Sequence, residues 1–315
     1  MTKNKFSDPL AELAKKRKRN TLFKTVLIAL ITILLVLGIT FKGLTYITSK
    51  NGQKAYNSFE RLSEVAYPNI SYDSLYYQPS GQFTGKVHAD RYKDINGVQI
   101  PYSSFEENYS ITGTFGTSAD ETSANNNLFD RGTRQKVPQF YNTKVKYDKG
   151  EVKTTPKNEL KYVNNLNNEL VEVAITFDKT YSYKEIKSMI PSNLKQNWLW
   201  IGTNTNLDTS YWPTKHQFGT SPDILNTPQI FVNNIKGNLK ENSEIYYQNV
   251  NILSDLKNYS KKYENTSSGD KLKFSGIILT GKAENFKQLD EKKWIYASSI
   301  GATIENKPYY HLEKK

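Results

Sequence analysis

The chain has no cysteine among its 315 residues, and it has only three histidines. Without cysteine it can form no disulfide, no thiolate metal site, no lipid-modified cysteine and no cysteine nucleophile. The histidines are His88, His216 and His311, and no two of them have the spacing of a zinc-protease helix. We therefore expect no metal ion, no cofactor and no catalytic residue.

Signatures of hydrolytic enzymes are missing or incomplete. There is no Gly-x-Ser-x-Gly sequence. Two Ser-x-x-Lys sequences begin at Ser192 and Ser254, as in penicillin-recognising enzymes, but the Lys-Thr-Gly sequence that those enzymes also need is absent. In a chain rich in serine and lysine, a polar helix surface is the simpler interpretation. The sequence favours a protein that is not an enzyme, and an envelope enzyme is the weakest of three hypotheses.

Long uncharged stretches are also rare, which makes the run from Thr25 to Phe41 informative. Twelve of its seventeen residues are Leu, Ile, Val or Phe. These residues favour membrane insertion by about 4–7 kcal/mol, and the run covers roughly 26 Å as a helix. A cleavable signal peptide is the alternative, but no small-residue cleavage site follows Gly38. We expect an uncleaved transmembrane helix over residues 25–44.

Positive charge is concentrated before this run. Residues 1–24 contain eight Lys or Arg and two acidic residues, and so hold half of the net charge of +12. Because basic flanks stay in the cytoplasm, the sequence predicts a single-pass protein of the cell membrane with a cytoplasmic N-terminus and an extracytoplasmic C-terminal domain. The remaining positive charge is dilute, so no direct nucleic-acid binding is expected. A large outer region without cysteine favours a Gram-positive cell surface.

The basic segment 1–24 contains a predicted short amphipathic helix. Asp8 is its expected cap, Pro9 lies in its first turn, and Ala14 ends its apolar stripe. A short helix needs a surface to lie on. One candidate is the lipid bilayer, and the other is a groove in a cytoplasmic protein. The candidate partner-binding residues are Phe6, Leu10, Leu13, Lys15 and Arg17.

The rest of the chain predicts an α+β fold. Residues 45–68 read as a helical stalk that stops before Pro68, and residues 69–155 as a strand-rich extracytoplasmic region. Asn96-Gly97 predicts a tight hairpin turn. The stretch from Thr117 to Asn127 has little to bury, and we expect a mobile loop there.

Residues 156–315 alternate between strand and helix patterns. One predicted β-α-β unit has strands at 170–177 and 198–201 around a helix that Ser182 and Glu185 begin with a capping box. The second has strands at 272–279 and 294–304 around a helix at 283–289, and another helix is expected at 250–263. Two such units can share a sheet in a ferredoxin-like split β-α-β arrangement.

Between the two units, residues 204–247 form a predicted long irregular segment. Its aromatic and histidine side chains make it a candidate sensor loop. Exposed rings could bind a sugar, a peptide or a cell-wall polymer, whereas buried rings would close the edge of the core. Core closure is favoured, because an irregular segment needs anchors of its own. The candidate residues are Tyr211, Trp212, His216 and Phe218.

Several stretches together resemble the sigma factor regulator family, which are membrane-anchored, anti-sigma-type proteins of Gram-positive bacteria. The resemblance covers the basic and apolar anchor at 15–40, Arg91–Val98, Phe129–Tyr141, and the C-terminal stretches Val173–Ser182, Trp198–Ile201, Ser275–Gly281 and Ala297–Gly301. It implies control of an extracytoplasmic-function sigma factor, with the inner segment holding the sigma factor and the outer domain sensing conditions or docking a membrane co-regulator.

The inner segment departs from zinc-containing anti-sigma domains, because its 24 residues include neither histidine nor cysteine. Only the predicted helix from Phe6 to Ala14 could hold a sigma factor. The first hypothesis is therefore a single-pass regulator of this type. The second is a cell-surface binding module that takes wall polymer or peptide through the segment 204–247.

Overall fold

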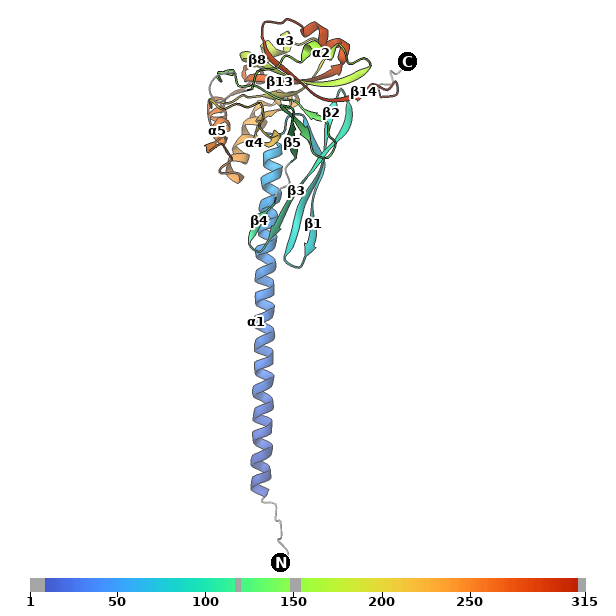
Figure 1. Cartoon of the computed structure of the whole chain (residues 1–315). Helices are drawn as coiled ribbons and strands as arrows, with labels where there is room; N and C mark the ends of the chain where they lie inside the picture. Colours follow the sequence, from blue (N-terminus) through green and yellow to red (C-terminus); the bar gives the residue numbers. More distant parts are fainter. Residues whose placement is uncertain (1–8, 117–119, 148–153, 311–315) are drawn as a thin grey trace, which may run out of the picture.

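A single helix dominates the molecule. The structure is a computed structural model that describes residues 9–116, 120–147 and 154–310. Helix α1 (Pro9–Ser63) is 55 residues long and carries the folded part at its C-terminal end (Figure 1). The prediction of a separate short helix ending at Ala14 is wrong, because strong helix formers continue the helix into the apolar run. Its expected Phe6 and Asp8 lie outside the described residues.

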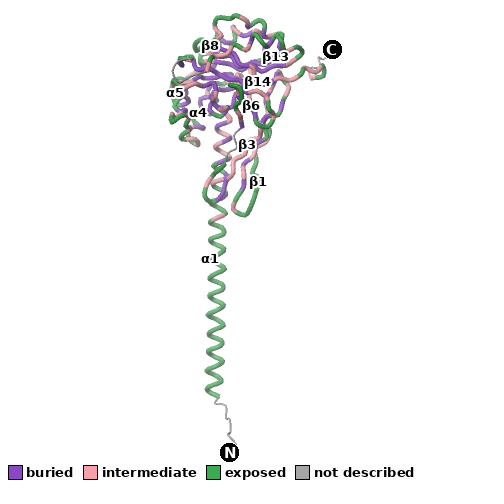
Figure 2. The backbone as a smooth tube through the Cα atoms, in the orientation of Figure 1, coloured by how far each residue is buried: buried purple, intermediate pink, exposed green. Residues whose placement is uncertain are grey.

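The environment of helix α1 differs between its N-terminal and C-terminal parts. Its apolar window could cross a membrane by length and composition, and none of that window is buried within the molecule (Figure 2). Beyond it, one face is buried at intervals of three and four residues, namely at Thr48, Gly52, Ala55, Phe59 and Leu62. The apolar N-terminal part indicates single-pass membrane anchoring, and the C-terminal part packs into the folded head.

The head contains four antiparallel sheets. A four-stranded sheet has the order β1-β2-β3-β4, a three-stranded sheet β5-β6-β7, a five-stranded sheet β10-β9-β13-β8-β14, and a short ribbon β11-β12. The strands are β1 Ile70–Gly81, β2 Thr84–Ile95, β3 Val98–Ser110, β4 Gly113–Phe115, β5 Glu121–Ala124, β6 Asn127–Asp130, β7 Lys136–Val137, β8 Glu169–Ser182, β9 Lys195–Trp200, β10 Gly219–Thr220, β11 Tyr246–Tyr247, β12 Val250–Asn251, β13 Lys273–Lys282 and β14 Ile295–Glu305.

The first sheet descends beside α1 (Figure 1). The predicted turn joins β2 to β3, where Asn96 and Gly97 both have positive φ, at 54° and 89°. Asparagine and glycine tolerate this left-handed conformation, so the Asn-Gly prediction is confirmed. The expected mobile loop before Asn127 is wrong from Glu121 onward, because β5 pairs with β6 there.

In the five-stranded sheet, β8 and β9 flank β13, and β13 and β14 flank β8. The connection β8–β9 holds α3 (Tyr183–Met189), which begins with the predicted Ser182–Glu185 capping box. The connection β13–β14 holds η4 (Ala283–Leu289), a 3-10 helix rather than an α-helix. The remaining helices are α2 Leu160–Val163, α4 Pro228–Glu241, α5 Leu253–Lys262, η1 Thr214–His216, η2 Pro222–Asn226 and η3 Gly269–Lys271.

The segment 204–247 is more regular than expected. It contains the 14-residue helix α4, which buries Phe231, Val232 and Ile235. The apolar positions recur at helical spacing after Pro228, whose fixed φ suits the first helical turn. The prediction of a wholly irregular segment is therefore wrong. Likewise, the predicted helix at 250–263 begins only at Leu253, after the short strand β12.

One continuous apolar core joins α1, the first sheet and the five-stranded sheet. At the end of α1 the chain docks directly on the larger sheet, because Gly219 N donates to Val65 O at 2.8 Å. Ala66 and Phe218 form an isolated antiparallel bridge beside it. The domain boundaries at 68 and 155 stay predictions.

We expect Gly219→Ala to lower the free energy of unfolding by about 1–3 kcal/mol or more. An added Cβ would lie 2.0 Å from the Leu199 carbonyl oxygen and 2.5 Å from the Trp198 ring, and a backbone oxygen within a sheet cannot move cheaply. Chemical denaturation of the full chain in detergent micelles measures this loss. Gly43→Ala is the control, because nothing lies within 4 Å of its added Cβ. Equal losses in the two variants would contradict the steric explanation.

Candidate functional site

The predicted partner-binding residues lie at the far end of α1. Leu10 and Leu13 have exposed fractions of 74% and 61%. Lys15 and Arg17 are also exposed, whereas Phe6 lies outside the described residues. These side chains form an accessible surface on the basic side of the apolar run. Their partner-binding role stays a prediction.

The predicted sensor loop is divided between core and cavity. Trp212 and Phe218 are each 1% exposed and belong to the main core. They therefore close the core, which was the favoured alternative, and they offer no exposed ledge. Tyr211 and His216 line a cavity that faces the end of α1. The sensing role of this segment stays a prediction.

We call this space the stalk cavity. Its volume is about 500 Å³, within the range of small-molecule sites. Helix α1, strands β3, β5 and β6, and the segments 211–216 and 242–245 surround it. Its lining residues are Ser58, Phe59, Leu62, Tyr67, Phe105, Glu107, Asp120, Glu121, Ser123, Leu128, Tyr211, Pro213, Lys215, His216, Asn242, Glu244 and Ile245.

Aromatic side chains form the apolar part of this lining. The Phe59 ring of α1 stacks on Phe105 of β3, with centroids 4.0 Å apart and an interplanar angle of 20°. Tyr67 lies beside Phe59, with centroids 6.0 Å apart. Phe59, Tyr67 and Phe105 are all buried. The end of α1 is thus part of the cavity wall and also part of the core.

Hydrogen bonds fix the same stretch of α1. Ser58 Oγ donates to Asn242 Oδ1 at 2.5 Å, and Asn242 Nδ2 donates to Ser58 O at 3.2 Å. About two turns earlier, Asn51 Nδ2 donates to Ser110 O at 2.8 Å. Since Ser58 and Asn242 both line the cavity, a molecule bound there would contact the groups that hold α1 against the head.

Asp120, Glu121 and Glu107 supply carboxyl groups to the polar part of the lining. Arg91 pairs with Asp120 at 2.8 Å, with their side chains 1% and 9% exposed. Glu121 accepts hydrogen bonds from the Thr214 backbone N–H and hydroxyl. Burial raises the pKa of Glu121 against the effect of these bonds, and burial also raises the pKa of Glu107. The cavity therefore combines aromatic walls with carboxyl groups that are partly shielded from solvent.

His216 is the other unusual group in the cavity. The residue is 8% exposed, and its Nδ1 has no hydrogen-bond partner in the described part of the chain. Burial, followed by the nearby charge of Lys215, lowers its pKa from 6.5 to about 4. Desolvation penalises the protonated ring, so the native state keeps His216 neutral over a range in which the unfolded chain binds a proton.

We expect this histidine to destabilise the head as the pH falls from about 6.5 to about 4. In that window the unfolded state binds more protons than the native state, so the stability present above pH 6.5 is lost. His216→Gln removes this contribution. The free energy of unfolding of the native sequence should fall relative to that of the variant by up to about 3 kcal/mol between pH 7 and pH 4. Parallel pH profiles in urea denaturation would contradict the prediction.

Most residues that line the stalk cavity cannot be recognised from the sequence. Phe59, Phe105 and Glu121 come from three separate elements, and nothing in their local sequence marks them as neighbours. The helical spacing of Ala55, Phe59 and Leu62 could have identified a buried face on the stalk. Within residues 9–116, 120–147 and 154–310, no group of three or more His, Asp or Glu side chains could hold a metal ion.

Comparison with known families gives two matches. Residues 11–100 match the model described as sigma factor regulator N-terminal. Residues 160–302 match the model described as sigma factor regulator C-terminal. No curated protein and no solved structure matches the chain. The first match includes the apolar part of α1 and the first hairpin, and the second includes four complete strands of the five-stranded sheet and most of β14.

Proposed function

Because the chain belongs to the sigma factor regulator family, we propose that it is a membrane-anchored anti-sigma-type regulator whose head responds to the cell envelope. In this proposal residues 1–24 lie in the cytoplasm and the head lies outside. The excess of basic residues before the apolar run supports this orientation. The regulatory family and the membrane helix support a non-enzymatic role.

The observation that carries the proposal is the continuity of α1. One uninterrupted helix joins the exposed Leu10 and Leu13 to Ser58 and Phe59 in the wall of the stalk cavity. A helix transmits a displacement along its axis without a flexible joint. A ligand that binds the cavity only when α1 is in one position would increase the population of that position. Because α1 is continuous, its N-terminal end would then shift together with its C-terminal end. The stalk cavity is therefore the proposed input.

The proposed output is the N-terminal end of α1. Its exposed leucines and flanking basic residues fit a groove in an extracytoplasmic-function sigma factor or in a membrane co-regulator. The same face can also lie on the bilayer surface, where basic residues meet anionic lipid. Exchange between these two surfaces would allow a shift of α1 to hold or release the partner.

We also infer that the five-stranded sheet contains a ferredoxin-like split β-α-β core. The strand order β9-β13-β8-β14, with α3 and η4 in the two crossover connections, supports this assignment. The edge strand β10 is then an addition supplied by the segment 204–247. The surface-module alternative depends on exposed rings at Tyr211, Trp212 and Phe218. Trp212 and Phe218 are buried, so we do not propose it.

The output is tested by co-purification of a sigma factor with the full chain from its native membrane. Leu13→Glu places a charge on the proposed contact face and should reduce recovery of the sigma factor by about tenfold or more, whereas Glu12→Gln on another face should not. Unchanged recovery with Leu13→Glu would refute this contact.

The proposal that the stalk cavity receives the signal is tested with a transcriptional reporter for that sigma factor. Ser123→Trp fills the stalk cavity from β5, and we expect it to change reporter output at equal protein levels. Thr122→Trp is the matched control, since neighbouring strand residues point to opposite faces and Thr122 does not line the cavity. If Ser123→Trp and the native chain give the same output while Leu13→Glu changes it, the cavity is not the input.

A further inference from the structure

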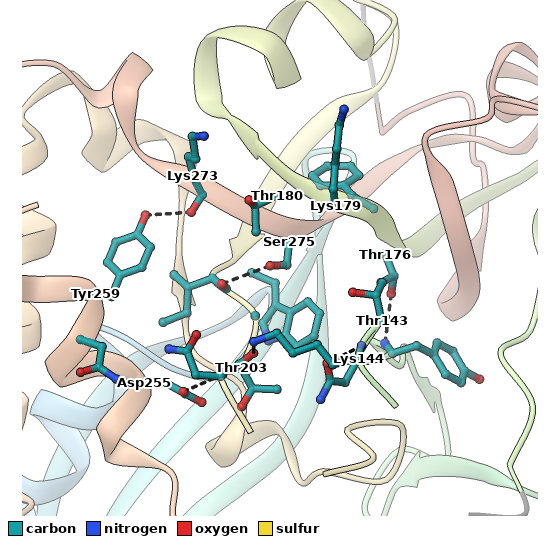
Figure 3. A pocket seen from close by; sticks show the side chains of 18 of the residues that line it. Thr143, Lys144, Thr176, Lys179, Thr180, Thr203, Asp255, Tyr259, Lys273 and Ser275 are labelled. Atoms are coloured by element: carbon teal, nitrogen blue, oxygen red, sulfur yellow. Dashed lines mark hydrogen bonds between the residues drawn. The ribbon is translucent and has the colours of Figure 1, made fainter. Parts of the chain in front are cut away.

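A second cavity in the head shares no lining residue with the stalk cavity. It opens between α5, the ends of β8 and β9, the beginning of β13 and the segment 141–144, and its volume is about 420 Å³ (Figure 3). None of its lining residues belongs to α1, so it is separate from the stalk cavity. We call it the lysine groove.

Positive charge distinguishes the lining of this groove. Four lysines line it, namely Lys144, Lys179, Lys262 and Lys273, against a single carboxylate, Asp255, among the described residues. None of the four lysines forms an ion pair with Asp or Glu in the described part of the chain, although eight other lysines do. In Figure 3, the Lys179 and Lys273 side chains lie in the upper part of the view, and Asp255 lies below them. Unpaired lysines around a concave surface favour an anionic ligand.

The single carboxylate is unusual as well. Asp255 is 2% exposed, and its Oδ1 accepts a hydrogen bond from the Asn204 backbone N–H at 2.8 Å. Its Oδ2 is buried and accepts no hydrogen bond of normal geometry from the described residues, and the Thr203 side chain lies close to the carboxylate. A buried acceptor without a partner is unfavourable, so the groove retains a site for a hydrogen-bond donor.

Hydroxyl groups complete the lining. Thr143, Thr176, Thr180, Thr203 and Ser275 all line the groove. Ser275 Oγ donates to Ile201 O at 3.3 Å, and Thr176 Oγ1 accepts from the Tyr141 N–H at 3.1 Å, so these two are already engaged. Lys144 Nζ donates to Thr203 O at 3.2 Å, which places one ammonium group near the loop that also binds Asp255.

We propose that the lysine groove binds a small phosphorylated polyol. The lysines hold the phosphate, and a hydroxyl of the polyol donates its hydrogen to Asp255 Oδ2. A simple anion satisfies only the lysines, and an uncharged polyol satisfies only Asp255. The groove therefore prefers a molecule that carries both groups over either group alone. This proposal is independent of the role of the stalk cavity.

The test is calorimetric titration of the full chain, in neutral detergent micelles, with glycerol 3-phosphate, glycerol or inorganic phosphate. Glycerol 3-phosphate should bind saturably and at least about tenfold more tightly than the other two. Lys179→Gln combined with Lys262→Gln should weaken its binding by about tenfold, whereas Lys240→Gln on α4, which does not line the groove, should leave it unchanged.

Asp255→Asn tests the second contact. Its amide oxygen can still accept from Asn204, but its amide nitrogen cannot accept from a ligand hydroxyl. In this variant glycerol 3-phosphate and inorganic phosphate should bind about equally. The proposal fails if the native chain does not bind glycerol 3-phosphate, or if it binds inorganic phosphate as tightly. It also fails if the double lysine variant binds as the native chain does. The double lysine variant changes only exposed side chains, so it should fold. Its binding result can therefore be interpreted even if Asp255→Asn does not fold.

Discussion

Lys93→Met should lower the free energy of unfolding by about 3–5 kcal/mol, because it leaves a buried carboxylate without its counter-charge. Lys93 Nζ on β2 lies 2.6 Å from Glu172 Oε2 on β8, and the two side chains are 1% and 0% exposed. This pair joins the first sheet to the five-stranded sheet across the core. Equilibrium denaturation of the full chain in detergent micelles, followed by near-ultraviolet circular dichroism, measures the loss.

Other hydrogen bonds hold Glu172 in place after Lys93 is removed. Asn69 Nδ2 donates to Oε1 at 2.8 Å, and the Ala302 N–H donates to Oε2 at 3.1 Å. These neutral donors cannot replace an ammonium group, so the isolated charge remains costly. Adding Glu172→Gln to Lys93→Met removes that charge and should recover much of the lost stability.

An exposed ion pair provides the comparison. Lys236 Nζ lies 2.7 Å from Glu264 Oε1, and the two side chains are 48% and 53% exposed. Lys236→Met should cost no more than about 1 kcal/mol, because water already screens that pair. If Lys93→Met and Lys236→Met have equal effects, the buried pair does not join the two sheets as described.

Phe59→Ala is the second large effect, with an expected loss of about 3–5 kcal/mol in the free energy of unfolding. The ring is 2% exposed and contacts aromatic side chains of the first sheet and of the turn after α1. Its removal leaves a void against Phe105 that rigid neighbouring strands cannot fill. The stability of the full chain in detergent micelles measures this loss.

Limited proteolysis shows where the loss occurs. We expect Phe59→Ala to make α1 open to cleavage between Thr48 and Leu62, because that face is held mainly by apolar contacts with the head. Tyr46→Ala is the matched control, since Tyr46 belongs to the same helix and is 70% exposed. A cleavage pattern equal to that of the control would mean that other contacts, such as Asn51 to Ser110, are sufficient to dock the helix.

Much of the local structure follows from nearby residues alone. The Asn96-Gly97 turn needs only two residues that tolerate positive φ, and the capping box needs only Ser182 and Glu185. The four strands of the two predicted β-α-β units are all present, within a few residues of their expected ends. Two of the predictions are wrong for related reasons. The stretch before Asn127 is polar, yet β5 gains its order from pairing with β6. In the segment 204–247, the prolines and aromatic residues obscure the helical spacing after Pro228.

Some residues of the stalk cavity can be recognised from the sequence, and others cannot. The sequence identified Tyr211 and His216 as unusual residues in one segment, and both line the stalk cavity. It also drew attention to Trp212, whose burial no local pattern could decide, because exposed and buried aromatic residues look alike in a sequence. Phe105 and Glu121 gave no signal at all, since each belongs to an ordinary polar-apolar strand.

The apolar run, the basic segment before it and the family resemblance can all be recognised without a structure, because hydropathy, charge and motif order depend only on residues that are near one another or in a fixed order. The folded chain is needed to show that α1 ends inside the head, that Lys93 is paired with Glu172, and that two cavities have different linings. These features join residues that are far apart in the chain. Their proximity is fixed by the packing of a common core, which local preferences do not specify.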